Sequence, residues 1–544
     1  MAQHPVGPHL PVPGVVFNPE AQTGLRRGFD TLARLLARTI GPTESHVLSA
    51  AGRTTGPELL TDSATIARRF LALPDRREDV GAMLARNLAW QIHRTTGDGC
   101  ATGVVLAQAM IATADRYAGG GVDVTELRHG IAAATDAALD ALRHMARPIQ
   151  GERDLLHVAQ TATAEPCLST LLAEIYDILG PDCYVTVEEY LAPYLEREYL
   201  PGGQWKALLA SPYLISSPEQ RCAVLQNAAV ALFAGEISDL DDIRPLLDML
   251  ASTDRRRLLL VANTIRGDAL SALVLNHQRR QLEVVAATLY RAGEHNREDF
   301  IDLAMLTGAR VLAPETGDRL AAITAADMGS AQYVKVTVDR LVVSDRNDKP
   351  ALREHIAALQ QQLARLVVAD EDQRNALHAR IGRLSGNVAA LKIGAATGSE
   401  AALLRQKAEH GLRALASAHA HGVVPGGGVA YLNCIPAVRE VGLTGDAGFG
   451  AAVVARALEA PFSWIVSNAG ARTPATVLAE MRRTGPRSGY DATCDRVVDL
   501  DDAGILDSAG VLRAALCTAA STATMLLATG AVVLKRQPEL SVEP

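Results

Sequence analysis

The sequence changes texture twice along the chain, and this order restricts the possible folds more than any single motif does. Early in the chain, apolar residues recur with the period of an amphipathic helix, as in Leu25, Phe29, Leu32, Leu36 and Ile40. Between about 180 and 345, short β-rich runs such as 184–187 and 258–261 alternate with helical segments, and helical patterns return from about 400. The order predicts a helical domain built from both chain ends, with an α/β domain inserted between them.

Two apolar stripes near the end of the inserted segment predict an antiparallel helical hairpin. The first stripe consists of Leu352, Ile356, Leu359, Leu363 and Leu366, and the second of Leu377, Ile381 and Leu384. The polar stretch 369–374 separates them, as expected for a connection between two amphipathic helices.

Size and charge exclude several classes of protein. A chain of 544 residues is longer than one hydrophobic core supports, so we expect two or more domains. The net charge of −8 argues against nucleic acid as a partner, because nucleic-acid binding requires a basic surface. We find no apolar run near the roughly 20 residues that cross a bilayer, and no signal-peptide pattern. We therefore expect a cytoplasmic protein with no membrane partner.

The strongest local motif is the turn Gly97-Asp98-Gly99, which precedes a helix that continues through Met110. A helix N-terminus offers free backbone N–H groups and a positive dipole end, so it can bind an anion. An aspartate in such a turn repels phosphate unless a divalent cation bridges the two. The same pattern also fits an aspartate that simply caps the helix without any ligand.

Together with other segments, this turn resembles the GroEL-like group I chaperonins. The matching segments follow one another in the family's order: Val16-Phe17-Asn18, 39–42, 61–63, 97–103, 211–213, 394–397, 422–428 and 504–507. The resemblance implies an α+β multidomain fold, with a helical equatorial domain (1–144 and 421–544), a small intermediate domain (145–200 and 389–420) and an α/β apical domain (201–388).

The resemblance also implies ATP and Mg²⁺ as cofactors. Residues expected around the nucleotide are Ile40, Gly41, Pro42, Gly97, Asp98, Gly99, Thr102, Gly427, Asp491, Ile505 and Asp507. Within this set, Asp98 is the expected Mg²⁺ ligand and Thr102 the expected hydroxyl donor to phosphate. Asp62 is expected to position the attacking water.

Several positions depart from the family pattern, and His410 is the most consequential. The family carries a catalytic aspartate at this position, twelve residues before Gly422. Cys100 and Ala101 also replace two threonines beside the phosphates. An imidazole supplies neither the ligand geometry nor the charge of a carboxylate, so we expect ATP hydrolysis to be severely slowed.

A second implied site is the family's apolar groove for unfolded chains. The matching residues are Leu209, Tyr213, Leu214, Leu247, Leu270, Val274 and Leu275, while Arg244 replaces a leucine. The implied partners are non-native polypeptides and identical subunits in a ring, and a GroES-like co-chaperonin is a possible further partner. Arg472 replaces an acidic residue of the ring-to-ring contact, so the number of rings stays open.

Alternative functions remain open. The chain is either a chaperonin ATPase that assists folding or a non-hydrolysing paralogue that acts as a holdase or a partner scaffold. ATP turnover distinguishes the two. A metal site built on His419 and His421 is disfavoured, because residues two positions apart do not share a helix face.

Overall fold

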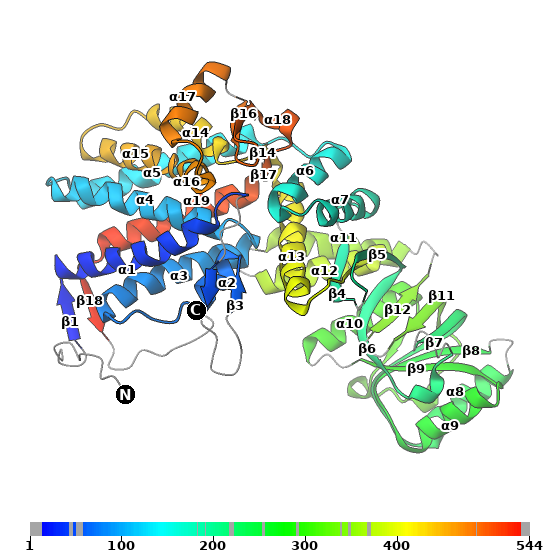
Figure 1. Ribbon diagram of the computed structural model, residues 1–544. Helices are drawn as coiled ribbons and strands as arrows, with labels where there is room; N and C mark the ends of the chain where they lie inside the picture. The colour runs from blue at the N-terminus through cyan, green and yellow to red at the C-terminus, as the bar shows by residue number, and fades with distance from the viewer. Residues whose placement is uncertain are drawn as a thin grey trace, which may run out of the picture. The chain divides into compact units, whose positions relative to one another are not determined.

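Two compact units make up the chain in the computed structural model (Figure 1). Unit 1 contains Met1–Asp177 and Ala395–Pro544, and unit 2 contains Ile178–Gly394. The structure describes residues 14–42, 47–49, 58–181, 183–190, 192–216, 222–252, 256–289, 293–337, 340–345, 350–366, 371–485 and 487–534. The three-domain division at 144, 200, 388 and 420 stays a prediction.

Unit 1 is predominantly helical. Its helices are α1 (Glu20–Leu36), α2 (Ser63–Arg69), α3 (Arg76–Thr96), α4 (Cys100–Gly119), α5 (Val124–Met145), α6 (Gly151–Thr163), α7 (Pro166–Leu179), α13 (Gly398–His421), α14 (Val429–Arg439), α15 (Asp446–Ala457), α16 (Ala460–Ala469), α17 (Pro474–Thr484), α18 (Leu500–Ala503) and α19 (Ala509–Ala528). Its strands form two-stranded pairs: β1 (Gly14–Phe17) with β18 (Ala531–Leu534), β2 (Val47–Ser49) with β3 (Glu58–Leu60), β14 (Val423–Pro425) with β17 (Leu506–Ser508), and β15 (Ser488–Asp491) with β16 (Arg496–Asp499).

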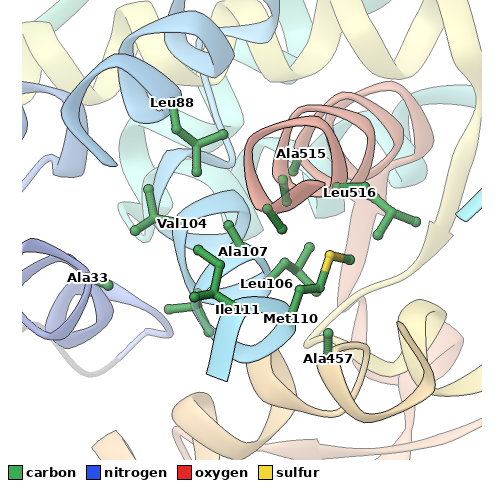
Figure 2. Close-up of a cluster of buried hydrophobic side chains, with 14 of the residues drawn as sticks. Ala33, Leu88, Val104, Leu106, Ala107, Met110, Ile111, Ala457, Ala515 and Leu516 are labelled. Carbon is green, nitrogen blue, oxygen red and sulfur yellow. The ribbon is translucent and has the colours of Figure 1, made fainter. Parts of the chain in front are cut away.

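The helix α4 runs through the core of unit 1. It is apolar on nearly every side, so it must be surrounded by other helices. Figure 2 shows its Val104, Leu106 and Met110 among side chains of α1, α3, α15 and α19. All three side chains are fully buried, which fixes α4 firmly in place.

Close packing of α1 against α3 depends on two glycines. A Cβ on Gly28 would lie 1.6 Å from the carbonyl oxygen of Glu78, and a Cβ on Gly81 would lie 1.9 Å from that of Leu25. Any larger side chain at either glycine would push the two helices apart. The close approach lets the predicted apolar stripe of α1 bury Leu25, Phe29 and Leu32 completely.

The helix α19 corrects one expectation from the sequence. Ala509–Ala528 is 20 residues long and apolar enough to span a membrane, and so is the stretch Asp446–Ala469. Of their apolar windows, 56% and 50% respectively are buried inside the protein. For α19, packing against α4 and α5 accounts for its composition as that of a core helix.

Unit 2 combines a mixed sheet with helices. Its strands are β4 (Tyr184–Glu189), β5 (Leu195–Pro201), β6 (Gly203–Leu209), β7 (Ala223–Ile237), β8 (Arg257–Ile265), β9 (Glu283–Leu289), β10 (Val311–Leu312), β11 (Gly329–Val336), β12 (Arg340–Ser344) and β13 (Asn387–Ile393). Its helices are α8 (Leu240–Ser252), α9 (Gly267–Gln278), α10 (Glu294–Thr307), α11 (Pro350–Arg365) and α12 (Glu371–Ser385).

The large sheet has the order β10-β7-β11-β12-β6-β9-β8, and a further β7–β8 pairing closes all of these strands except β10 into a ring. Successive side chains of a strand point to opposite faces, so each strand serves two cores. In β7, Val230 and Leu232 join the core with α10, α11 and α12, whereas Ala231 and Phe233 join the core with α8 and α9. A smaller sheet has the order β4-β13-β5.

The predicted helical hairpin is confirmed as α11 and α12, and a buried ion-pair cluster anchors it. Arg380 on α12 donates to both carboxylate oxygens of Asp302 on α10, over 2.9 and 2.8 Å. Nearby, Arg383 donates to Asp299 over 2.9 Å. Burial alone would raise the pKa of Asp302, but its contacts with His355 and Arg380 hold it below the usual value. The hairpin is therefore joined to α10 by charges that must stay paired.

We expect Arg380→Leu to destabilise unit 2 by about 3 kcal/mol or more, because it leaves a buried carboxylate without its main partner. The free energy of unfolding of unit 2 is measured by denaturation in urea, with hydrogen exchange in peptides of β7 and β8 as the readout. The matched control is Arg244→Leu, since Arg244 is 59% exposed and pairs with the exposed Asp241. That change should cost about 1 kcal/mol or less. Equal losses in the two variants would contradict a structural role for the buried cluster.

Candidate functional site

A cavity of about 490 Å³ lies within unit 1, where several of its loops converge on α13. Its lining comes from Val158 and the segments 39–42, 61–63, 98–102, 160–164, 490–493 and 503–508, together with residues of α13 such as Gln406 and His410. These segments come from both ends of the chain, so the site exists only in the folded unit.

The cavity brings together most of the predicted site residues. Ile40, Gly41, Pro42, Asp62, Asp98, Gly99, Thr102, His410, Gly427, Asp491, Ile505 and Asp507 all line it. Gly97 is not among its lining residues and instead ends α3 with a left-handed φ of 70°. The roles assigned to these residues stay predictions.

The turn at residues 97–99 requires its two glycines. Both have left-handed φ values, and a Cβ on Gly97 would lie 2.0 Å from Cδ of Arg413. Gly99 then begins α4 as its N-cap, without a side-chain hydrogen bond to the first turn. The backbone N–H groups of the first turn of α4 have no partner within the helix. Cys100, Ala101 and Thr102 of this first turn line the cavity. The geometry is that of an anion-binding helix N-terminus.

A second glycine turn reaches the cavity from the opposite end of the chain. Gly427 and Gly428 have φ values of 63° and 77°, and Gly426 N–H donates to the carbonyl of Ile505 over 2.8 Å. Pairing of β14 with β17 holds this turn beside Ile505 and Asp507. The nearest protein atom to a Cβ on Gly427 would be 3.8 Å away, so the backbone is open to a ligand there.

Asp62 is held in place by a chain of hydrogen bonds. Its Oδ2 caps α2 by accepting from the backbone N–H of Thr65 over 2.7 Å and from the Thr65 hydroxyl over 2.8 Å. Gln406 on α13 in turn donates to the Thr65 hydroxyl over 2.7 Å. Sequence reasoning missed Thr65 and Gln406. The signal for Gln406 was its position one helical turn before His410.

The closest charged contact in the cavity joins His410 to Asp98. Nε2 of His410 lies 2.9 Å from Oδ1 of Asp98, and the side chains keep 28% and 34% of their surface exposed. The contact joins the imidazole ring to the carboxylate as an ion pair when the ring is protonated. Burial would lower the pKa of His410, but its contact with Asp98 and the charge of Asp62 together outweigh burial and raise the pKa to about 9. The ring is therefore positively charged at neutral pH.

Carboxylates dominate the electrostatics of the cavity. Asp62, Asp98, Asp491 and Asp507 line it, and burial together with the charge of Asp98 raises the pKa of Asp507 to about 7. Burial would also raise the pKa of Asp98, but His410 and the N–H of Gly99 hold it below its usual value. A polyphosphate could enter only with its charge offset by a cation or by the N-terminus of α4.

The residues fit a nucleotide better than they fit a metal ion. The cavity is large enough for a nucleotide, and it offers an anion-binding helix N-terminus and an open glycine turn at Gly427. Among the residues that the structure describes, no three His, Cys, Asp or Glu side chains gather as metal ligands. Mg²⁺ at Asp98 stays a prediction, and the contact with His410 argues against it.

The residues predicted to form an apolar groove lie in unit 2, around α8 and α9. Tyr213 and Leu275 are 70% and 45% exposed, whereas Leu209, Leu247, Leu270 and Val274 are partly buried against the core. The prediction that Leu214 lines the groove is wrong, because Leu214 is fully buried in that core and its side chain cannot contact a ligand. Its neighbour Tyr213 takes the exposed position in the short turn at Pro212–Leu214 instead.

Comparison with known proteins gives one family and one fold. Residues 32–179 and 237–537, well over half of the chain, match the model of the TCP-1/cpn60 chaperonin family. Two crystal forms of the chaperonin gp146 from the bacteriophage EL 2 (Pseudomonas aeruginosa), both in presence of ATP-BeFx, have a similar structure. Their TM-scores are 0.63 and 0.69 at 17% and 18% sequence identity. Each alignment covers 96% of this chain and 99% of the phage protein.

Proposed function

Because the chain belongs to the TCP-1/cpn60 chaperonin family, we propose that it is a ring-forming chaperone subunit that binds ATP, holds non-native polypeptides and hydrolyses ATP slowly. Membership supports a chaperone role and the predicted chaperonin fold. The observation that carries the finer proposal is the ion pair of His410 with Asp98 inside a cavity lined by the predicted nucleotide residues.

ATP binding is supported by the shape and backbone of the cavity. The first turn of α4 would receive phosphate oxygens at its free N–H groups, with the Thr102 hydroxyl beside them. Gly427 would allow the ribose to approach the backbone, and Ile505 would give the base an apolar surface. Hydrolysis would cleave the bond to the terminal phosphate of the bound ATP. Asp62, held by Thr65, would orient a water toward them.

Slow hydrolysis follows from the residue at position 410. In the resembling family this position holds an aspartate, which adds negative charge where water is activated. Here a positively charged ring contacts Asp98, so it cannot accept a proton from water while it stays protonated. Asp62 remains as the carboxylate able to orient the water, which supports slow turnover rather than none.

The second candidate function is a non-hydrolysing holdase or scaffold. The His410–Asp98 ion pair favours it, because the same contact that slows hydrolysis would also hold α13 against the N-terminus of α4 within unit 1. ATP would then act as a ligand rather than as a fuel. Measured ATP turnover decides between the two candidates.

Further parts of the proposal follow the family resemblance. We propose the equatorial, intermediate and apical division given above, a cytoplasmic location and a GroES-like protein as a possible partner. Binding of non-native chains is supported by Tyr213 and Leu275, which expose apolar surface beside α8 and α9.

Ring formation is supported by the sheet that joins the chain ends. Val15 and Phe17 point to the same face of β1, and Val533 lies opposite Val15 on β18. Their exposed fractions are 50%, 67% and 64%, so the described part of unit 1 presents an apolar two-stranded face. A second copy of the chain is the partner that we propose for this face.

We expect His410→Asp to raise the rate of ATP turnover by about 10²–10³-fold, the effect of restoring one group that stabilises charge in a transition state. The assay is steady-state phosphate release with Mg²⁺ in excess. His129→Asp makes the same exchange at an exposed position of α5 and should leave the rate unchanged. Wild-type turnover as fast as that of the variant would contradict the catalytic assignment of position 410.

We expect the double variant Tyr213→Glu, Leu275→Glu to lose the ability to suppress aggregation of a denatured model protein, because charges at exposed apolar positions repel non-native chains. Light scattering during dilution from denaturant provides the measurement. Tyr199→Glu changes an exposed aromatic residue of β5 and should keep suppression intact. If both proteins suppress aggregation equally, the binding surface lies elsewhere.

We expect the wild-type protein to sediment as an oligomer and Phe17→Asp to sediment as smaller species, since a buried charge without a partner weakens an apolar interface. Analytical ultracentrifugation with and without ATP provides the measurement. Leu71→Asp places a charge at another exposed apolar position and should leave the oligomer intact. A wild-type protein that is monomeric in both conditions would refute the ring.

A further inference from the structure

The charge around the cavity poses a problem for any polyphosphate. Four aspartates line it, and the basic residues among its described lining are Lys407 and His410. Lys407 already pairs with Glu165 over 3.2 Å. The ring of His410 instead lies at the phosphate-binding end of the cavity, beside Asp98 and the N-terminus of α4.

Contacts at Asp98 place His410 where a metal ion would have to bind. Oδ1 of Asp98 is 2.9 Å from Nε2 of His410, and the same oxygen accepts from the N–H of Gly99. Mg²⁺ requires oxygen ligands at about 2.1 Å in a nearly octahedral shell. A metal ion at Oδ1 would displace the ring, and one at Oδ2 would have to fit its octahedral ligand shell beside the ring. Asp98 is therefore a poor metal ligand in this arrangement.

We propose that His410 takes the place of the divalent cation at Asp98, so that this cavity binds the triphosphate of ATP without Mg²⁺. The proposal rests on the ATP binding proposed above and goes beyond it by stating which side chain occupies the position of the metal ion. The imidazole ring would occupy the side of Asp98 that a metal ion needs, and the first turn of α4 would offer its N–H groups to the phosphates.

The helix that carries His410 fixes the position of the ring beside Asp98. His410 lies in the middle of α13, one turn after Gln406, whose side chain binds Thr65 of α2 over 2.7 Å. On the next turn, Arg413 contacts His93 of α3 over 3.2 Å. These two contacts hold α13 against α2 and α3, and so they hold the ring beside Asp98.

The test compares ATP affinity with and without metal by isothermal titration calorimetry on the full chain. Wild-type protein should bind ATP with a Kd that changes by less than about threefold between excess Mg²⁺ and excess EDTA. His410→Asp removes the ring and places a second carboxylate beside Asp98, so a metal ion can bind there. The affinity of this variant for ATP should fall by about tenfold or more when EDTA removes the metal. Glu409→Gln is the control, since Glu409 is 49% exposed and pairs with Arg405. Like the wild type, it should bind ATP independently of metal.

The outcomes separate this inference from the proposed function. If the wild-type protein binds ATP only with Mg²⁺, the inference is wrong while ATP binding itself stands. If it binds ATP in neither condition, the proposed function and the inference both fail. If His410→Asp also binds ATP equally well in EDTA, His410 is not the group that replaces the metal. The wild-type comparison needs no variant, so the test holds even if a variant fails to fold.

Discussion

The burial of α4 is the constraint on which the rest of unit 1 depends. Its apolar surface is enclosed by α1, α3, α15 and α19, so the helix cannot shift without opening the core. Because such a shift would cost free energy of packing, the N-terminus of α4 keeps its position. Its backbone N–H groups and the preceding Asp98 therefore stay in place beside the cavity. Chemistry at the site therefore relies on packing that lies up to five helical turns away along α4.

The electrostatic character of the cavity follows from this fixed N-terminus. Four carboxylates face a space that the proposed function fills with phosphates, and a site of that kind needs compensating positive charge. His410 supplies it from a separate helix, α13, which α2 and α3 hold in place through Gln406 and Arg413. One substitution thus alters both the expected hydrolysis and the expected metal requirement.

Sequence reasoning predicted the periodic features well and the contacts less well. The spacing of Leu25 and Phe29 fits one face of a helix, and two glycines around one aspartate at 97–99 indicate a turn. Burial of Leu214 was not predictable, because a neighbouring turn residue decides which of two adjacent side chains faces outward. The bond from Gln406 to Thr65 joins residues 341 positions apart and depends on tertiary packing alone. The family resemblance identified the lining of the cavity, but it gave no view of how His410 meets Asp98.

Both ends of the chain supply walls of the cavity, and this has a consequence for the order of synthesis. Segment 39–42 leaves the ribosome early, whereas 503–508 and the strand β18 that pairs with β1 follow more than 450 residues later. Unit 2 is one continuous stretch and can fold while the ribosome is still translating α13 to α19. The helices of the first third must wait, with apolar faces uncovered, until α19 arrives. A protein of this family would itself need protection from aggregation during that interval.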